Sequence, residues 1–162
     1  MKKVEGRNFE IRRSLLKFDN VMNEQRKIIY SQRKEIITED SINVLINDMR
    51  NDFIEETVNE YVPDVNSFDD KTEISLKSEL KKSLNLNLDF KDIKEKENFI
   101  IEDLSENIKN KSDIHLSKKR TEYGDEIFNI AEKTLLLQTI DNSWREHLLS
   151  LDHLRQGISL RA

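Results

Sequence analysis

The residues from Asn8 to Ile37, NFEIRRSLLKFDNVMNEQRKIIYSQRKEII, decide the fold. They contain no proline or glycine, and a stripe of mostly apolar residues recurs through them at alternating steps of four and three. This 3.5-residue repeat predicts one long helix of roughly 45 Å, with Asn8 as its N-cap. The stripe consists of Ile11, Leu15, Phe18, Met22, Gln25, Ile29, Gln32 and Ile36.

Further apolar residues of this helix, Leu16, Val21, Ile28 and Ile37, fall outside the stripe. A lone surface helix presents one apolar face, whereas this one presents more. We therefore expect it either to lie between other elements or to serve as a backbone on which other domains dock. An apolar surface left open would favour dimers or packing of the last helix back onto the first.

Composition points to a helix-rich chain with a thin core. Of 162 residues, 36% are charged and 36% are hydrophobic, and there are only three glycines and one proline. Typical domains have about 25% charged and about 45–50% apolar residues. We expect an all-α fold: an elongated chain with a long first helix, a small helical module in the middle and a second long C-terminal helix.

Several classes are excluded by composition. The chain has no cysteine, which rules out disulfides, thiolate zinc sites and a cysteine nucleophile. Gly6, Gly124 and Gly157 are too far apart for a glycine-rich phosphate loop. The longest apolar run, 135–137, is far too short to span a bilayer. These features predict a soluble, cytosolic chain without a nucleotide-binding fold of its own.

Charge is unevenly distributed along the chain. Residues 1–35 carry ten basic and five acidic side chains, and residues 36–117 carry ten basic and twenty acidic ones. The basic first segment could suit nucleic acid or anionic lipid. We favour a solvated helix face with ion pairs, because no RNA-binding or zinc-finger motif accompanies it and the acidic middle would repel phosphates.

The middle of the chain predicts short elements around one break. Pro63 disfavours helix at the residue before it, and a polar segment follows. Residues 85–90 alternate polar and apolar, as in a strand, although a loop that packs its apolar side chains inward is an equal alternative. The predicted order is a helix over 41–61, a loop over 63–71, a short helix over 72–84, the alternating segment, and a helix over 97–110.

The last helix is the most apolar part of the chain. We expect it to run from Tyr123 or Asp125 to about Leu154, with Trp144 as a core anchor. Its predicted apolar face consists of Ile127, Ile130, Leu137, Trp144, Leu148, Leu151 and Ile158, with Leu136, Ile140, His147 and Leu154 alongside.

No pattern in the sequence predicts a catalytic, cofactor or metal site. His147 and His153 are six residues apart and do not share a helix face, and no HExxH motif is present. No nucleophile neighbours Asp141 or His147, so a structural histidine is the better interpretation. The adjacent acid pairs, such as Asp69–Asp70, point apart on a helix and indicate solvation.

Two stretches of the chain carry long, specific motifs. They are VEGRNFEIR (4–12) with FDNVMNEQR (18–26) and Ile29–Tyr30, and LQTIDNSWREHL (137–148) with DHLRQGISLR (152–161). In this order they resemble the SecA family, the ATP-driven motors of bacterial preprotein translocation. Together they cover about half of the chain, and residues 40–117 correspond by position to the family's variable helical wing. Asn20 and Ser159 replace an Asp and a His that are common in the family, and both changes are tolerable.

The resemblance implies a domain order and a non-catalytic role. Residues 1–40 would be the long scaffold helix, 41–120 the helical wing module, and 121–162 the second scaffold helix with the first helix of the two-helix finger. The nucleotide-binding folds and the preprotein-crosslinking domain are not in this chain, so we expect a C-terminal fragment that is no enzyme and holds no cofactor. ATP and magnesium would belong to the parent protein.

The resemblance also implies partners and contact residues. The partners would be the other SecA domains, the SecYEG channel and the preprotein, but no nucleic acid. The parent would be cytoplasmic and peripheral on the cytoplasmic face of the inner membrane. The contact residues would be Phe18, Asp19, Gln25, Arg26, Tyr30, Leu154, Arg155, Gln156 and Gly157, the last four near the tip of the finger's first helix.

The residues alone leave two alternative hypotheses open, each from a different functional class. One is a free-standing helical adaptor that binds a partner helix in a groove. The other is a basic-helix nucleic-acid binder, which salt-dependent DNA binding would reveal.

Overall fold

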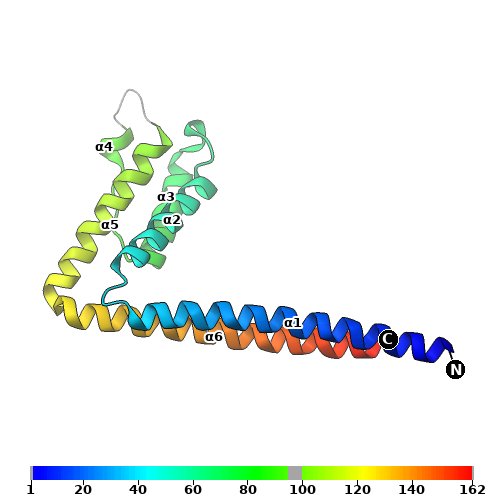
Figure 1. Ribbon diagram of the computed structural model, residues 1–162. Helices are drawn as coiled ribbons and strands as arrows, with labels where there is room; N and C mark the ends of the chain where they lie inside the picture. The colour runs from blue at the N-terminus through cyan, green and yellow to red at the C-terminus, as the bar shows by residue number, and fades with distance from the viewer. Residues whose placement is uncertain (1, 95–99, 162) are drawn as a thin grey trace. The chain divides into compact units, whose positions relative to one another are not determined.

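The computed structural model describes residues 2–94 and 100–161, and every regular element in these ranges is helical, so the predicted all-α class is confirmed (Figure 1). Within the described residues, no helix combines the length and the apolar character that a bilayer crossing requires. The elements are α1 (Lys2–Thr38), α2 (Asn43–Tyr61), the 3₁₀ turn η1 (Val65–Ser67), α3 (Asp70–Leu84), α4 (Lys91–Lys94), α5 (Ile101–Tyr123) and α6 (Asp125–Arg161).

The chain divides into two compact units. We call Met1–Ile42 together with Ile130–Ala162 the paired-helix unit, and Asn43–Asn129 the middle unit. The boundary between them falls inside α6, which begins in the middle unit and continues in the paired-helix unit.

Helix α1 is longer than its sequence pattern predicts. It begins at Lys2, so the prediction of Asn8 as N-cap is wrong. No proline precedes Asn8, and the glycine at position 6 costs a helix only about 1 kcal/mol relative to alanine. Helix formation therefore continues through Asn8 towards the N-terminus.

The predicted stripe of α1 is confirmed with one change of position. All its residues except Gln32 are buried or half-buried, and Arg33 takes the place of Gln32. The departure is confined to this one position, because Ile36, the next residue of the stripe, is buried and Ile37 is exposed. Arg33 forms an ion pair with Asp141 of α6, which accounts for its place in the buried line.

The middle unit encloses the main apolar core of the described residues. Its centre is formed by side chains from α2, α3, the following loop and α5, and Phe68 packs edge-on against Phe90 with ring centroids 6.0 Å apart. Lys77 and Lys111 lie over the Phe90 ring. The core consists of Ile54, Val58, Val62, Leu76, Leu80, Leu86, Phe90, Ile93, Leu104 and Ile108.

The alternating segment 85–90 is a loop and not a strand. Leu86 and Phe90 are buried in the core, and Leu88 is half-buried against it. Asn85 begins the segment in the left-handed conformation, with φ 54°, and caps α3 through its backbone N–H, which donates to Leu80. Asparagine tolerates this conformation better than most residues. The turn directs alternate side chains inward, where the core holds them without a partner strand.

Helices α5 and α6 both extend beyond the predicted ends. Helix α5 continues to Tyr123, whereas the prediction ended at 110, and its predicted start at 97–99 lies outside the described residues. Helix α6 begins at Asp125, as predicted, and continues past Leu154 to Arg161. The glycine at 124 is the first helix-breaking residue after Pro63, which explains where α5 ends.

Asp69 is the N-cap of α3. Its carboxylate accepts a 2.7 Å hydrogen bond from the backbone N–H of Thr72, and this bond lowers the pKa of Asp69 below its ordinary value. A carboxylate at a helix N-terminus is also favoured by the helix dipole. The capped end follows directly on the loop that the sequence predicts after Pro63.

Ile54→Ala tests the core of the middle unit. Ile54 is 0% exposed, so we expect the substitution to lower the free energy of unfolding by about 2–5 kcal/mol through lost burial and a cavity. Val44→Ala, on the same helix at a residue 75% exposed, is the matched control and should change it by no more than about 0.5 kcal/mol. Urea unfolding followed by circular dichroism measures both; equal effects would contradict this core.

Asp69→Ala tests the cap and its pH dependence. Because the folded-state pKa is lowered, the cap stabilises the fold above the ordinary carboxyl pKa of 3.8, and this stability is lost as pH falls through the lowered value. We expect Asp69→Ala to unfold at lower urea than the wild type at pH 7, and the gap to shrink in acid. Asp69→Asn keeps an acceptor and should unfold near the wild type at both pH values. A gap independent of pH would contradict the assignment.

Candidate functional site: the paired face of α1 and α6

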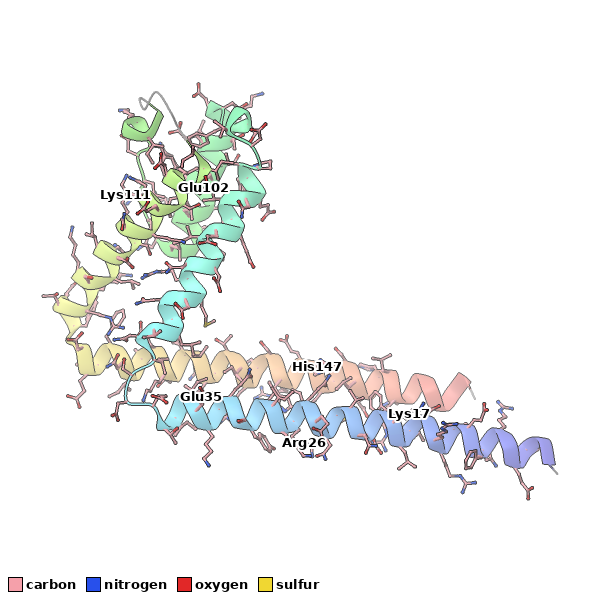
Figure 2. All side chains as sticks on the ribbon, turned by 45° about the horizontal axis from the view of Figure 1, so that its top comes forward. Lys17, Arg26, Glu35, Glu102, Lys111 and His147 are labelled. Atoms are coloured by element: carbon pink, nitrogen blue, oxygen red, sulfur yellow. The ribbon has the colours of Figure 1, made fainter. Side chains whose placement is uncertain are left out.

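Helices α1 and α6 lie side by side and run in opposite directions, as Figures 1 and 2 both show. The last helix thus folds back on the first, one of the two outcomes expected for an open apolar stripe. On α6, Leu151 is buried, and Leu137, Ile140, Trp144 and Leu148 are half-buried. These residues and the stripe of α1 form what we call the seam.

The predicted apolar face of α6 is wrong at its start. Ile127 and Ile130 are both exposed, and the side chain of Ile158 lies outside the described set. Helix α1 ends at Thr38, and Lys133 of α6 donates a hydrogen bond to the backbone carbonyl of Glu39, just beyond that end. Ile130 precedes Lys133 by about one turn, so α1 offers it no facing turn.

Polar contacts cross the seam at several levels and fix its register. Arg33 is half-buried and forms an ion pair with Asp141. From one contact to the next, the residue number on α1 rises while the number of its partner on α6 falls, as an antiparallel pair requires. In order, the contacts are Asp19 to Arg155 (4.0 Å), Gln25 to His147 (2.8 Å), Arg33 to Asp141, and Glu39 to Lys133.

His147 has a structural role at the seam. Its Nε2 lies 2.8 Å from Oε1 of Gln25, and its ring stacks beside Trp144 with centroids 5.6 Å apart. Figure 2 labels His147 on α6, alongside α1. Asp141 is engaged with Arg33 instead, so the two residues considered for a catalytic pair serve separate contacts with α1.

Outside the seam, α1 carries large apolar side chains that α6 does not cover. Val21 is 55% exposed and Ile28 57% exposed, and Leu16, Tyr30 and Ile37 are exposed as well. An exposed apolar side chain needs no explanation by itself, but Val21 and Ile28 are seven residues apart and so lie along one line of the helix. This matches the expectation that α1 is apolar on more than one side.

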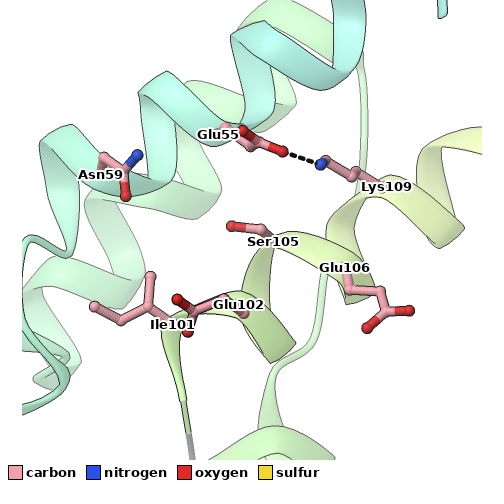
Figure 3. A pocket seen from close by; sticks show the side chains of 7 residues that line it. All are labelled: Glu55, Asn59, Ile101, Glu102, Ser105, Glu106 and Lys109. Atoms are coloured by element: carbon pink, nitrogen blue, oxygen red, sulfur yellow. Dashed lines mark hydrogen bonds and ion pairs between the residues drawn. The ribbon is translucent and has the colours of Figure 1, made fainter. Parts of the chain in front are cut away.

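A groove of about 540 Å³ lies between α2 and α5 in the middle unit (Figure 3). Glu55 of α2 forms an ion pair with Lys109 of α5 at the edge of the groove. The lining is mostly polar, with three glutamates and one lysine around the Ser105 hydroxyl. The lining residues are Glu55, Asn59, Ile101, Glu102, Ser105, Glu106 and Lys109.

The described residues contain no group of three or more histidine, aspartate or glutamate side chains that could hold a metal ion. The candidate site considered further consists of the seam and the uncovered sides of α1.

The comparisons with known proteins agree with this description. The model of the SecA Wing and Scaffold domain matches residues 1–162. The chain belongs to this family. It is 45% identical to the protein translocase subunit SecA of Bradyrhizobium diazoefficiens and 43% identical to SecA 1 of Rhodopseudomonas palustris, each over 98% of this chain. A SecA 1 of Nitrobacter hamburgensis is 41% identical over the same share.

The chain spans only 17% of the length of these curated SecA relatives. The matched region is the wing and scaffold, and the resemblance seen in the sequence is confirmed.

The residues predicted to make SecA domain contacts fall into two groups. Phe18 and Gln25 are half-buried in the seam, and Gly157 is half-buried on α6 with open space where a Cβ would stand. The other residues are exposed, and three of them touch the same unit: Asp19 pairs with Arg155, and Gln156 donates to Asp152 at 3.0 Å. The exposed group is Asp19, Arg26, Tyr30, Leu154, Arg155 and Gln156.

Sequence reasoning missed Arg33, Asp141 and Lys133 as seam contacts. One signal was present in the SecA stretch itself: Gln25 interrupts an apolar stripe, and a polar residue at such a position needs a polar partner on the facing helix. That partner is His147. Arg33 gave no such signal, because the 3.5-residue repeat predicted Gln32, and not Arg33, as the stripe residue between Ile29 and Ile36.

A double-mutant cycle tests the Arg33–Asp141 pair. Both side chains are partly exposed, so we expect a coupling energy of at most about 1 kcal/mol between Arg33→Ala and Asp141→Ala. Arg26→Ala, an exposed site on the same helix, should show no coupling to Asp141→Ala. Trp144 is the only tryptophan, so its fluorescence follows unfolding of the seam. Equal coupling for Arg26 and Arg33 would contradict this register.

Proposed function

We propose that this chain is a non-catalytic scaffold and coupling segment of a SecA ATPase that drives preprotein export through the SecYEG channel. The observation that carries the proposal is the uncovered apolar surface of α1 at Val21 and Ile28. In the parent, the nucleotide-binding folds and the preprotein-crosslinking domain would pack there. The parent would work from the cytoplasm, peripheral on the inner membrane.

The seam supports this role because packing against α6 stabilises α1 as a long, straight helix. An isolated helix gains little stability from its own hydrogen bonds, and packing against α6 supplies what propensity does not. The contacts between α1 and α6 occupy one side of α1 and leave Val21 and Ile28 accessible. A long helix that packs against α6 on one side and exposes apolar side chains on another can bind further domains along its length.

The proposal predicts that the chain alone does not hydrolyse ATP. The sequence has no glycine-rich loop with a lysine to cradle phosphates, and ATP and magnesium belong to the parent's nucleotide-binding folds. Purified chain incubated with ATP and magnesium should release phosphate only at the rate of a mock purification. Turnover that rises in proportion to the amount of chain would contradict the non-catalytic role.

Val21→Asp with Ile28→Asp tests the docking surface. In the isolated chain these exposed sites should shift the free energy of unfolding only slightly, because exposed substitutions act within about ±0.5 kcal/mol. In a full-length SecA that carries this segment, the buried charges should weaken domain packing and reduce ATP-driven translocation. Asn20→Asp is the matched control at an exposed polar site of the same helix. Unchanged translocation by the double variant would favour a separate adaptor role.

Arg155→Ala with Gln156→Ala tests coupling near the end of α6. Both residues are exposed, and their contacts to Asp19 and Asp152 lie at the surface. We expect thermal unfolding of the chain to be nearly unchanged. In the full-length protein the same change should alter translocation or ATP turnover, whereas the exposed control Asn142→Ala should not. Strongly shifted unfolding with normal transport would make the two residues structural.

A further inference from the structure

Helices α5 and α6 meet at a corner made of one residue. Helix α5 ends at Tyr123 and α6 begins at Asp125, and Gly124 between them has φ 86°. Its N–H donates to Arg120 at 2.8 Å, and its carbonyl accepts from Phe128 at 3.1 Å. No neighbouring atom lies within 4 Å of the place where a Cβ would stand. A glycine with open space around it would by itself allow the corner to swivel.

Arg120 spans this corner from the last turn of α5. One guanidinium nitrogen donates to Oδ1 of Asn129 at 3.2 Å and lies 3.7 Å from the carboxylate of Asp125. The guanidinium carbon is 4.8 Å from the centre of the Phe128 ring. Three residues in the first turns of α6 are thus held by one side chain, across the glycine.

The same side chain reaches a third helix. Its second terminal nitrogen donates to Oδ1 of Asn43, the first residue of α2. The Arg120 side chain is only 20% exposed, although its partner Asp125 is 81% exposed. A planar guanidinium offers donors in fixed directions, so it can hold two partners at a set angle, which an ammonium group cannot do.

We propose that Arg120 is a positioning residue that braces the α5–α6 corner. Its contacts hold the first turns of α6 next to the start of α2, so residues Asp125–Asn129 move together with the rest of the middle unit. The angle between α5 and the first turns of α6 is then set by the contacts of Arg120 and not left free at Gly124. This inference rests on contacts within the middle unit and does not depend on the proposed function.

The neighbouring lysine provides the contrast. Lys118 is exposed on the same helix, two residues before Arg120, and lines a shallow surface made of α5 residues alone. A brace role predicts that the two positions differ sharply in their effect on the corner. A general effect of positive charge near the end of α5 predicts that they do not.

Paired spin labels measure the corner directly. The chain has no cysteine, so Asp48→Cys on α2 and Glu126→Cys on α6, both at exposed sites, provide two unique labelling positions. We expect a narrow distance distribution in the otherwise wild-type chain and a broad one with Arg120→Ala. Lys118→Ala should leave it narrow. Arg120→Lys should broaden it in part, because one ammonium group does not span both partners.

Hydrogen exchange separates a local effect from unfolding. With Arg120→Ala, the amides of Phe128 and Asn129 should exchange about tenfold faster, the effect of losing a charge-assisted contact, while amides near Ile54 in the core keep their rates. A distribution that stays narrow with Arg120→Ala overturns the proposal. The proposal is also overturned if Arg120→Ala accelerates exchange of the core amides as much as that of Phe128 and Asn129. It is overturned too if the distance distribution of Arg120→Lys is as narrow as that of the wild type.

Discussion

The packing of α1 against α6 is the interaction on which the paired-helix unit depends. Neither helix can bury an apolar stripe alone, and each helps to bury the other's along the seam. The ion pair between Arg33 and Asp141 and the contact of Gln25 with His147 add register to an attraction that is otherwise non-directional. The register in turn decides which residues of α1 stay uncovered by α6. Among these, Val21 and Ile28 form the proposed docking surface for other domains.

The middle unit is built on a different principle. It has a closed core around Phe90 and Ile54, and it surrounds that core with ion pairs such as Arg50 to Asp113 and Lys109 to Glu55. The apolar side chains of this core come from several helices and from the loop between α3 and α4. The pair of Lys109 with Glu55 lies at the surface, where ion pairs contribute little to stability, whereas Arg50 is buried and meets the exposed Asp113 at the edge of the core.

Much of this architecture could be predicted from sequence because helical periodicity is a local property. The stripe from Ile11 to Ile36 predicted the seam, and Pro63 predicted the end of α2. The errors arise where one helix meets another. The replacement of Gln32 by Arg33 depends on the ion pair that Arg33 forms with Asp141, and the exposure of Ile130 depends on where α1 ends. Arg120 carried no local signal, since its partners lie on two other helices, α2 and α6.

The central claim is that the apolar side of α1 away from the seam is covered in a complete SecA protein. Hydroxyl-radical footprinting of Val21 and Ile28 tests it most directly, with the exposed Val44 of α2 as an internal reference. Labelling of both residues, relative to Val44, should be strong in this chain and suppressed in a full-length SecA that contains it. Equal labelling in the two proteins would contradict the claim and leave α1 without the partner that its apolar surface implies.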